Sequence, residues 1–133
     1  MALTVVDAGI VIAVLSPADI HHAAAKSALR DALATGETLV LPVSAYAEVL
    51  VAPFRQDGEA AAIVDAFIDA LPATVQPITR EIARAAAALR AQFGTRLRLP
   101  DALVVATALE LSADRLLTTD RRWPDVAVAI KAI

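Results

Sequence analysis

The feature that most constrains this chain is the alternation of short apolar, β-branched runs with longer segments of helical periodicity. The expected strands are short runs bounded by turn or cap residues, at 4–6, 38–41, 74–78, 116–118 and 126–130. The expected helices lie between them, at 9–15, 19–35, 42–54, 57–71, 79–94 and 100–111. Strands that alternate with helices in this way predict an α/β fold, with helices on both faces of a parallel sheet.

Capping residues mark several of these boundaries. Asp19 and Thr79 stand where a side-chain oxygen can accept a hydrogen bond from the first helical turn. Gly36 and Gly94 stand where two of the helices are expected to end. No repeat, low-complexity segment or linker divides the 133 residues, so we expect residues 1–133 to form a single domain.

The composition excludes several kinds of protein. The chain has no cysteine, which rules out disulfide frameworks, thiolate metal sites and cysteine nucleophiles, and which suits a reducing cytoplasm. The apolar runs at 8–15 and 102–109 are far shorter than the ~20 residues of a membrane-spanning helix. We therefore expect a cytoplasmic protein with no membrane contact.

The charge of the chain argues against general nucleic-acid binding. The formal net charge is -3, whereas such binders neutralise phosphates with an excess of cations. Contact with a nucleic acid therefore requires a local basic patch. The candidates for phosphate contacts are arginines close to acidic residues in the sequence, namely Arg96, Arg98, Arg121 and Arg122. Each of them can equally be an ordinary solvated side chain.

Four of the 15 acidic residues stand among apolar neighbours rather than on polar helix faces: Asp7, Glu48, Asp101 and Asp120. An ionised carboxylate buried without a partner is costly, so each needs a hydrogen bond, a proton or a cation. Asp7 and Asp101 can simply cap helices, and Asp120 can be a turn residue. Glu48 has no such explanation, because it lies in the middle of a predicted helix.

The predicted topology brings these acids towards one edge of the sheet. Asp7 and Asp120 follow strands, and the carboxyl ends of parallel strands form the usual ligand-binding edge. Converging carboxylates repel one another unless a cation lies among them, and Mg²⁺ or Mn²⁺ prefers oxygen ligands. A site of this kind supports phosphodiester hydrolysis. The hydroxyls that can assist it, or serve only the backbone, belong to Ser44, Thr118 and Thr119.

The four acids lie within four segments whose order and spacing match a known family. These segments are VVDAGIVIA at 5–13, PVSAYAEVL at 42–50, LPDALVVATA at 99–108 and LLTTDRRW at 116–123. Together they resemble the PIN-domain nucleases, and among them the VapC-type toxins of bacterial toxin–antitoxin pairs. In this resemblance Asp7, Glu48 and Asp101 fall on the three most constant acids of the family, and Asp120 on the more variable fourth.

The resemblance implies a PIN-like, three-layer α/β/α sandwich with Mg²⁺ at the four acids and endonucleolytic cleavage of RNA. It also implies a homodimer and a cognate antitoxin whose tail blocks the cleft. Two positions depart from the family pattern. Gly9 stands where many relatives carry Ser or Asn, which puts part of the support of the site in doubt, and Trp123 stands where Phe is commoner, which looks harmless.

Other functions remain open at this point. A phosphatase that forms an aspartyl phosphate also places an Asp after its first strand, but it needs a second Asp two residues later, where this chain has Gly9. The non-enzymatic alternative is a catalytically silent module of the same fold that acts only through a protein partner. Retention of all four acids argues against it, since such a module has no reason to tolerate their repulsion.

Overall fold

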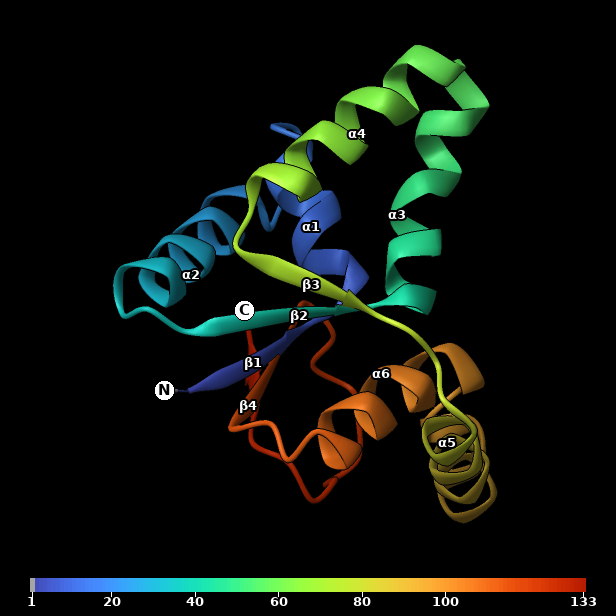
Figure 1. Cartoon of the computed structure of the whole chain (residues 1–133). Helices are drawn as coiled ribbons and strands as arrows, with labels where there is room; N and C mark the ends of the chain where they lie inside the picture. Colours follow the sequence, from blue (N-terminus) through green and yellow to red (C-terminus); the bar gives the residue numbers. More distant parts are fainter. Residues whose placement is uncertain (1) are drawn as a thin grey trace.

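The computed structural model describes residues 2–133 and has a five-stranded sheet at its centre (Figure 1). The strands are β1 (Leu3–Val6), β2 (Thr38–Pro42), β3 (Ala73–Gln76), β4 (Arg115–Thr118) and β5 (Ile130–Ala132). They lie in the order β3-β2-β1-β4-β5, and every neighbouring pair is parallel. The first strand of the chain, β1, is therefore the central strand of the sheet. Its Val5 pairs with Val40 of β2 and with Leu116 of β4.

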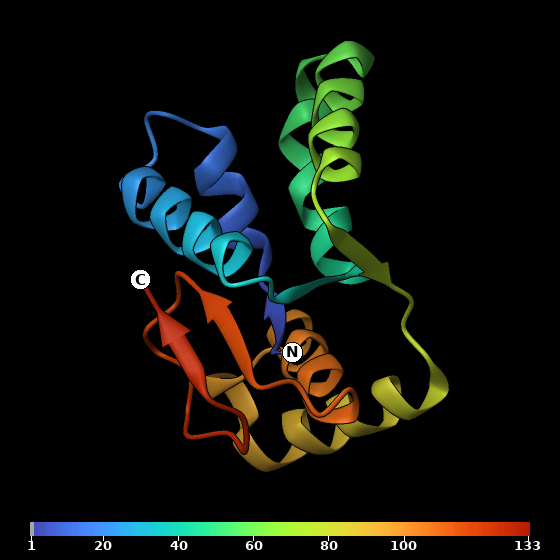
Figure 2. The same cartoon turned by 60° about the vertical axis from the view of Figure 1, so that its left-hand side comes forward.

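Six α-helices cover this sheet. They are α1 (Ala8–Leu15), α2 (His22–Ala34), α3 (Val43–Gln56), α4 (Gly58–Ala70), α5 (Arg80–Phe93) and α6 (Leu99–Glu110), with a 3₁₀ turn at Gly94–Arg96. Figure 1 shows α1 to α4 on one side of the sheet and α5 and α6 on the other. The turned view in Figure 2 shows α3 and α4 as a hairpin that projects away from the strands. This is the predicted three-layer α/β/α sandwich.

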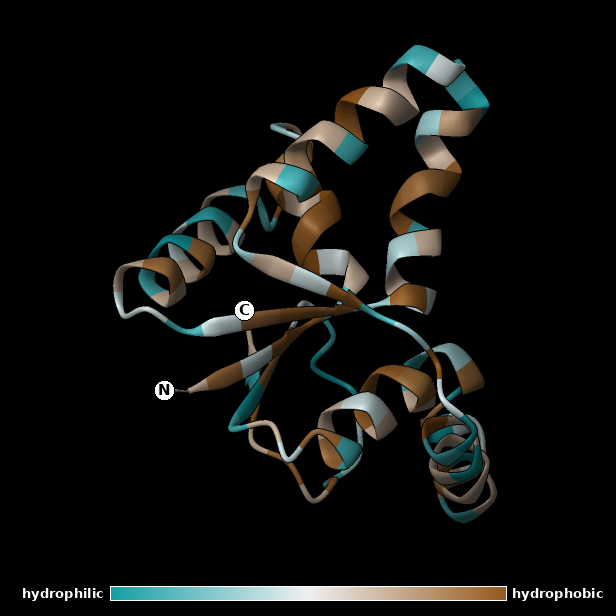
Figure 3. Ribbon diagram, viewed as in Figure 1, coloured by the Kyte–Doolittle hydropathy of each residue, from teal (hydrophilic) through white to brown (hydrophobic). Residues whose placement is uncertain are grey.

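Burial explains why the strands are continuous apolar runs instead of alternating ones. Thr4, Val5 and Val6 of β1 are all buried, because helices cover both faces of a parallel sheet. Helix α6 is buried almost all round, from Val104 to Ala108. Figure 3 shows the apolar residues gathered on the strands and the helices beside them, with hydrophilic residues along α5 and at the tip of the α3–α4 hairpin.

Two predicted boundaries are wrong. Helix α2 begins at His22 and not at Asp19, because the Asp19 carboxylate accepts the backbone N–H of His21 at 2.8 Å and closes a turn there. The last strand is β5 (Ile130–Ala132), later than the expected 126–130. Val126 is buried like a strand residue, but its carbonyl accepts the N–H of Val128 at 2.8 Å, so the chain turns before it joins the sheet.

Most other boundaries agree with the sequence. Thr79 caps α5 through its hydroxyl, which accepts the N–H of Ile82 at 3.1 Å, and Asp57 caps α4. Gly36 and Gly94 have positive φ angles at the ends of their helices. Among residues 2–133, no helix combines the length and the hydropathy of a membrane span.

Candidate active site

The carboxyl edge of the sheet positions two of the four acids on adjacent strands. Asp7 follows β1 directly, and its backbone N–H donates to the carbonyl of Leu117 at 2.9 Å, which extends the pairing of β1 with β4. Asp120 comes just after β4. Glu48 lies in α3, which starts where β2 ends, and Asp101 lies in the first turn of α6.

Asp7 is held by neutral groups alone. Its Oδ1 accepts the N–H of Ala8 at 2.9 Å, which makes it the N-cap of α1, and its Oδ2 accepts the Thr118 hydroxyl at 2.8 Å. Neither ion pair in the described part of the chain involves it. Burial raises the pKa of Asp7 from 3.8 to about 6, helped by the charges of Asp101 and Glu48 and opposed by its hydrogen bonds. A plain helix cap would have the opposite shift, because the helix N-terminus favours the carboxylate.

Asp101 is electrostatically linked to each of the other acids. Partial burial and the charge of Asp120 raise its pKa, and the Trp123 side chain and the charges of Arg122 and Arg98 only partly oppose this. The charge of Asp101 in turn raises the pKa of Asp7. Four acids from distant parts of the sequence are thus coupled along one edge.

Glu48 differs from the expectation drawn from its apolar sequence neighbours. Its side chain is exposed, whereas Val49, the next residue, is buried, because the two point to different sides of α3. The remaining burial, followed by the charge of Asp101, still raises the pKa of Glu48. Its carboxylate lines a groove with Ile12 of α1 and Ile63 of α4, apart from the cavity that holds Asp101 and Asp120.

Asp120 is fixed by a local turn. Its Oδ1 accepts the backbone N–H of Arg122 at 2.8 Å, and the Arg122 Nε lies 3.4 Å from the same oxygen. The Asp120 N–H donates to the Thr118 hydroxyl at 3.0 Å. Because that hydroxyl also donates to Asp7, Thr118 joins the ends of β1 and β4 and orients the Asp7 carboxylate.

The other two candidate hydroxyls, those of Ser44 and Thr119, differ in their surroundings. The Oγ of Ser44 is buried and has no hydrogen-bond partner among the described residues. Thr119 is packed against the backbone of α1, where a Cβ added to Gly9 would lie 2.5 Å from the Thr119 Oγ1. The Thr119 hydroxyl therefore takes the space that a side chain at position 9 would need.

Three of the four candidate arginines lie with two of the acids. A cavity of about 480 Å³ is lined by side chains of both charges and by one aromatic ring, from Thr95, Arg96, Arg98, Asp101, Asp120, Arg122 and Trp123. Arg121 instead lines an adjoining cavity of about 470 Å³ beside Asp120. The exposed guanidinium groups leave room for a polyanion next to the acids.

Trp123 belongs to the site, although the sequence marked it only as a harmless departure from the family pattern. Its indole Nε1 is buried and makes no hydrogen bond of normal geometry in the described structure. It is still near enough to the Asp101 carboxylate to lower the pKa of that group. The substitution of Trp for the commoner Phe was the available signal, since Trp adds a donor that a buried site must satisfy.

The oxygen donors of the site suit Mg²⁺ or Mn²⁺, although the acids do not form a complete coordination shell. Within residues 2–133, no three or more Asp, Glu, His or Cys side chains are grouped closely enough to hold a metal ion by themselves. Mg²⁺ commonly binds one or two carboxylates and keeps several waters, so a closed protein cage is not required. The donors at the edge are all oxygens, and their mutual repulsion is what a cation relieves.

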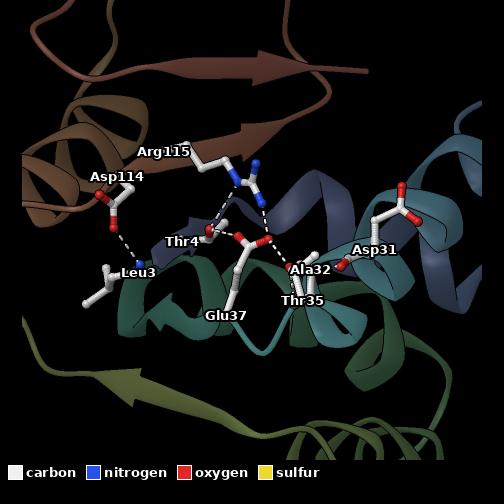
Figure 4. Close-up of polar contacts among 8 residues, drawn as sticks. All are labelled: Leu3, Thr4, Asp31, Ala32, Thr35, Glu37, Asp114 and Arg115. Atoms are coloured by element: carbon white, nitrogen blue, oxygen red, sulfur yellow. Dashed lines mark hydrogen bonds and ion pairs between the residues drawn. The ribbon is translucent and has the colours of Figure 1, made fainter. Parts of the chain in front are cut away.

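Another carboxylate, at the amino ends of the strands, is buried and fully bonded within the fold, so it cannot serve as a ligand. Glu37 precedes β2, is 7% exposed, and accepts hydrogen bonds from Thr4, Thr35 and Arg115 (Figure 4). Burial raises its pKa, but these hydrogen bonds and the charge of Arg115 outweigh burial and hold the pKa below its usual value. This cluster is a structural ion pair.

Comparisons with known proteins agree with this architecture. The sequence model of the PIN domain family matches residues 4–129. A search of curated proteins finds no match.

Solved structures of low sequence identity share the fold. VapBC2 from Rickettsia felis, bound to a DNA fragment from its promoter, is 14% identical with a TM-score of 0.76, over 98% of each chain. A toxin–antitoxin complex from Klebsiella pneumoniae is 23% identical with a TM-score of 0.75, over 99% of this chain and 97% of the other. VapC20 from Mycobacterium tuberculosis, a toxin that cleaves the sarcin–ricin loop, is 18% identical with a TM-score of 0.69, over 85% of this chain and 86% of its own.

Proposed function

Because this chain belongs to the PIN domain family, we propose that it is a metal-dependent endoribonuclease whose site consists of Asp7, Glu48, Asp101 and Asp120. Residues 1–133 act as one nuclease domain. The observation that carries the proposal is the setting of Asp7, a partly buried carboxylate at the ligand-binding edge that no cationic side chain pairs with and whose pKa is raised.

The acids divide the work of binding and orientation. Asp7 and Asp101 are the main candidates to hold Mg²⁺ or Mn²⁺, and Glu48 and Asp120 are further acids whose charges couple to them. When bound, the ion supplies an activated water and stabilises charge on the phosphate. Thr118 keeps the Asp7 carboxylate in one orientation by donating to its Oδ2, while Ser44 and Thr119 provide further hydroxyls.

RNA phosphates are the proposed ligands of the arginine cavity. Arg96, Arg98 and Arg122 line it beside Asp101 and Asp120, and Arg121 continues the basic surface into the adjoining cavity. Guanidinium groups bind phosphate through paired N–H donors, which positions the backbone without reading the bases. A local patch of this kind permits RNA binding by a chain whose net charge is -3.

The biological role we propose is that of the toxin of a toxin–antitoxin pair, active in the cytoplasm. Its support is the shared fold with toxin–antitoxin proteins such as VapBC2 of Rickettsia felis and the complex of Klebsiella pneumoniae. By this analogy the chain forms a homodimer and is inhibited by a cognate antitoxin that covers the acids.

The test is incubation of the purified protein with total cellular RNA in the presence of Mg²⁺, Mn²⁺ or EDTA, followed by mapping of the cleaved ends. We expect cleavage with either metal, none with EDTA, and none from Asp7→Asn. Asp31→Asn, on the exposed surface of α2, is the matched control and should cut like the wild type. Equal cleavage by Asp7→Asn and the wild type would reject the site. A folded wild type that cuts no RNA under any condition would favour the silent binding module.

A further inference from the structure

The indole of Trp123 ends in a buried donor that the fold itself does not use. Trp123 lies in the loop after β4, and its ring packs against the hydrophobic core. The Nε1 atom is excluded from solvent and has no hydrogen-bond partner of normal geometry in the described part of the chain. Leaving such a donor unsatisfied destabilises the protein, so a purely structural ring would be better served by Phe.

The chemistry of the cavity wall leaves one main anionic acceptor for this donor. The three arginines of the cavity, Arg96, Arg98 and Arg122, offer only donors. Asp120 already accepts three contacts from Arg122, at 2.8, 3.4 and 3.5 Å, which occupy both of its carboxylate oxygens. Asp101 lines the same cavity as Trp123, and none of the hydrogen bonds described for residues 2–133 occupies its carboxylate.

We propose that Trp123 is a positioning residue for Asp101: in the loaded site its indole N–H binds one carboxylate oxygen and leaves the other for the divalent cation. This inference rests on the proposed nuclease function. Hydrogen bonds of catalytic groups are often long or poorly aligned in the free protein and shorten in the complex, which accounts for the unmet geometry of Nε1 here. Groups that orient a metal ligand typically contribute 10–100-fold to metal affinity or activity.

The test compares Trp123→Phe, which removes the donor and keeps an aromatic ring, with replacement of the tryptophan by benzothienylalanine, which removes only the N–H. Trp123 is the one tryptophan of the chain, so the replacement is unique. We expect both variants to need at least about 10-fold more Mg²⁺ for half-maximal cleavage. The KM for RNA at saturating Mg²⁺ should stay close to that of the wild type, and the melting temperature in EDTA should not fall, because the variants lose an unsatisfied buried donor. Trp123→His, which restores an N–H, should recover part of the loss.

Mn²⁺ binding, followed by the rise in melting temperature, separates this proposal from the nuclease function. If the wild type binds Mn²⁺ but cuts no RNA, an approximately 10-fold weaker Mn²⁺ response in the benzothienylalanine protein still supports the positioning role. If the wild type cuts RNA and the benzothienylalanine protein has the same metal dependence, the positioning role is rejected and the nuclease function stands. A wild type that neither binds Mn²⁺ nor cuts RNA overturns both.

Discussion

At the amino end of the sheet Glu37 is buried with an arginine, and at the carboxyl end Asp7 is partly buried without one. Glu37 accepts hydrogen bonds from Thr4, Thr35 and Arg115, so three segments converge on one carboxylate (Figure 4). Asp7 has only a backbone N–H and a hydroxyl, with two further acids close enough to repel it. The pKa of Glu37 is lowered and that of Asp7 is raised.

Burial alone therefore does not distinguish a structural acid from a functional one. Burial raises the pKa of both groups, and the partners decide the outcome. A carboxylate compensated within the fold stabilises the protein and has nothing left to bind. A carboxylate left uncompensated destabilises the free protein and gains most when a cation arrives.

The largest expected effect is on activity at the carboxyl end. Asp101→Asn keeps the size of the side chain but removes the charge that couples to Asp7, Glu48 and Asp120. We expect RNA cleavage to fall by more than about 100-fold, beyond the usual effect of a residue that only orients a ligand. Initial rates with Mg²⁺ measure this. Glu37→Gln is the control from the other end, and its cleavage rate should stay near that of the wild type at a temperature where it is folded. An equal loss of RNA cleavage in Asp101→Asn and Glu37→Gln would show that the acids at the two ends of the sheet do not differ in function.

The next effect is on stability at the amino end. Arg115→Met leaves the Glu37 carboxylate buried without its cation, which costs about 3–5 kcal/mol in a fully buried pair. Because the Arg115 side chain is 35% exposed, we expect about 2 kcal/mol from urea unfolding. The Mg²⁺ concentration needed for cleavage should not change. An unaltered free energy of unfolding would mean that the ion pair contributes nothing to the fold.

An effect of similar size on stability separates the two ends by its pH dependence. The pKa of Asp7 is raised from 3.8 to about 6, so the folded state binds this proton more tightly than the unfolded chain does. Its stabilising contribution is complete below pH ~4 and is lost as the pH rises through about 6. In EDTA, Asp7→Asn should therefore be more stable than the wild type above pH 6, on the order of 2 kcal/mol, with the difference shrinking towards pH 4.

The contribution of Glu37 to stability depends on pH in the opposite direction. Its pKa is lowered below 4.5, so its contribution is present above that pH and is lost as the pH falls through the lower, folded-state value. Urea unfolding of Glu37→Gln, Asp7→Asn and the wild type between pH ~2.5 and pH 8 measures both pH dependences. Parallel pH profiles for the two variants would contradict the account.

The smallest expected effect concerns Gly9 and Thr119. Gly9→Ala places a Cβ 2.5 Å from the Thr119 Oγ1, so Thr119 must rotate or shift, at about 1 kcal/mol of stability. Thr119→Ala removes the clash, so the double variant should lose less than the sum of the two single changes. Additive losses in melting temperature and cleavage rate would show that the two positions do not share one space.

Much of the fold was predictable because continuous apolar strands alternate with helical segments. That pattern fixed the order of elements, and Asp7 and Asp120 follow strands as expected. The position of β5 was not predictable, since Val126 is buried without joining a strand and apolar character alone marked both segments.

The site was predictable in its residue types and less so in its contacts. Neighbours in sequence suggested a buried Glu48, but the helix turns that side chain outward. The partnership of Glu37 with Arg115 joins residues 78 positions apart, which no local pattern reveals. The buried donor of Trp123 becomes visible only when the fold shows that Nε1 has no other partner.

The most direct test of the central claim is an anomalous difference map from crystals of the wild-type protein soaked in Mn²⁺. We expect a peak at the carboxyl edge of the sheet, in contact with oxygens of Asp7 or Asp101 and absent from Asp101→Asn crystals. A map with no Mn²⁺ at this edge, or with Mn²⁺ bound only elsewhere on the surface, would contradict it.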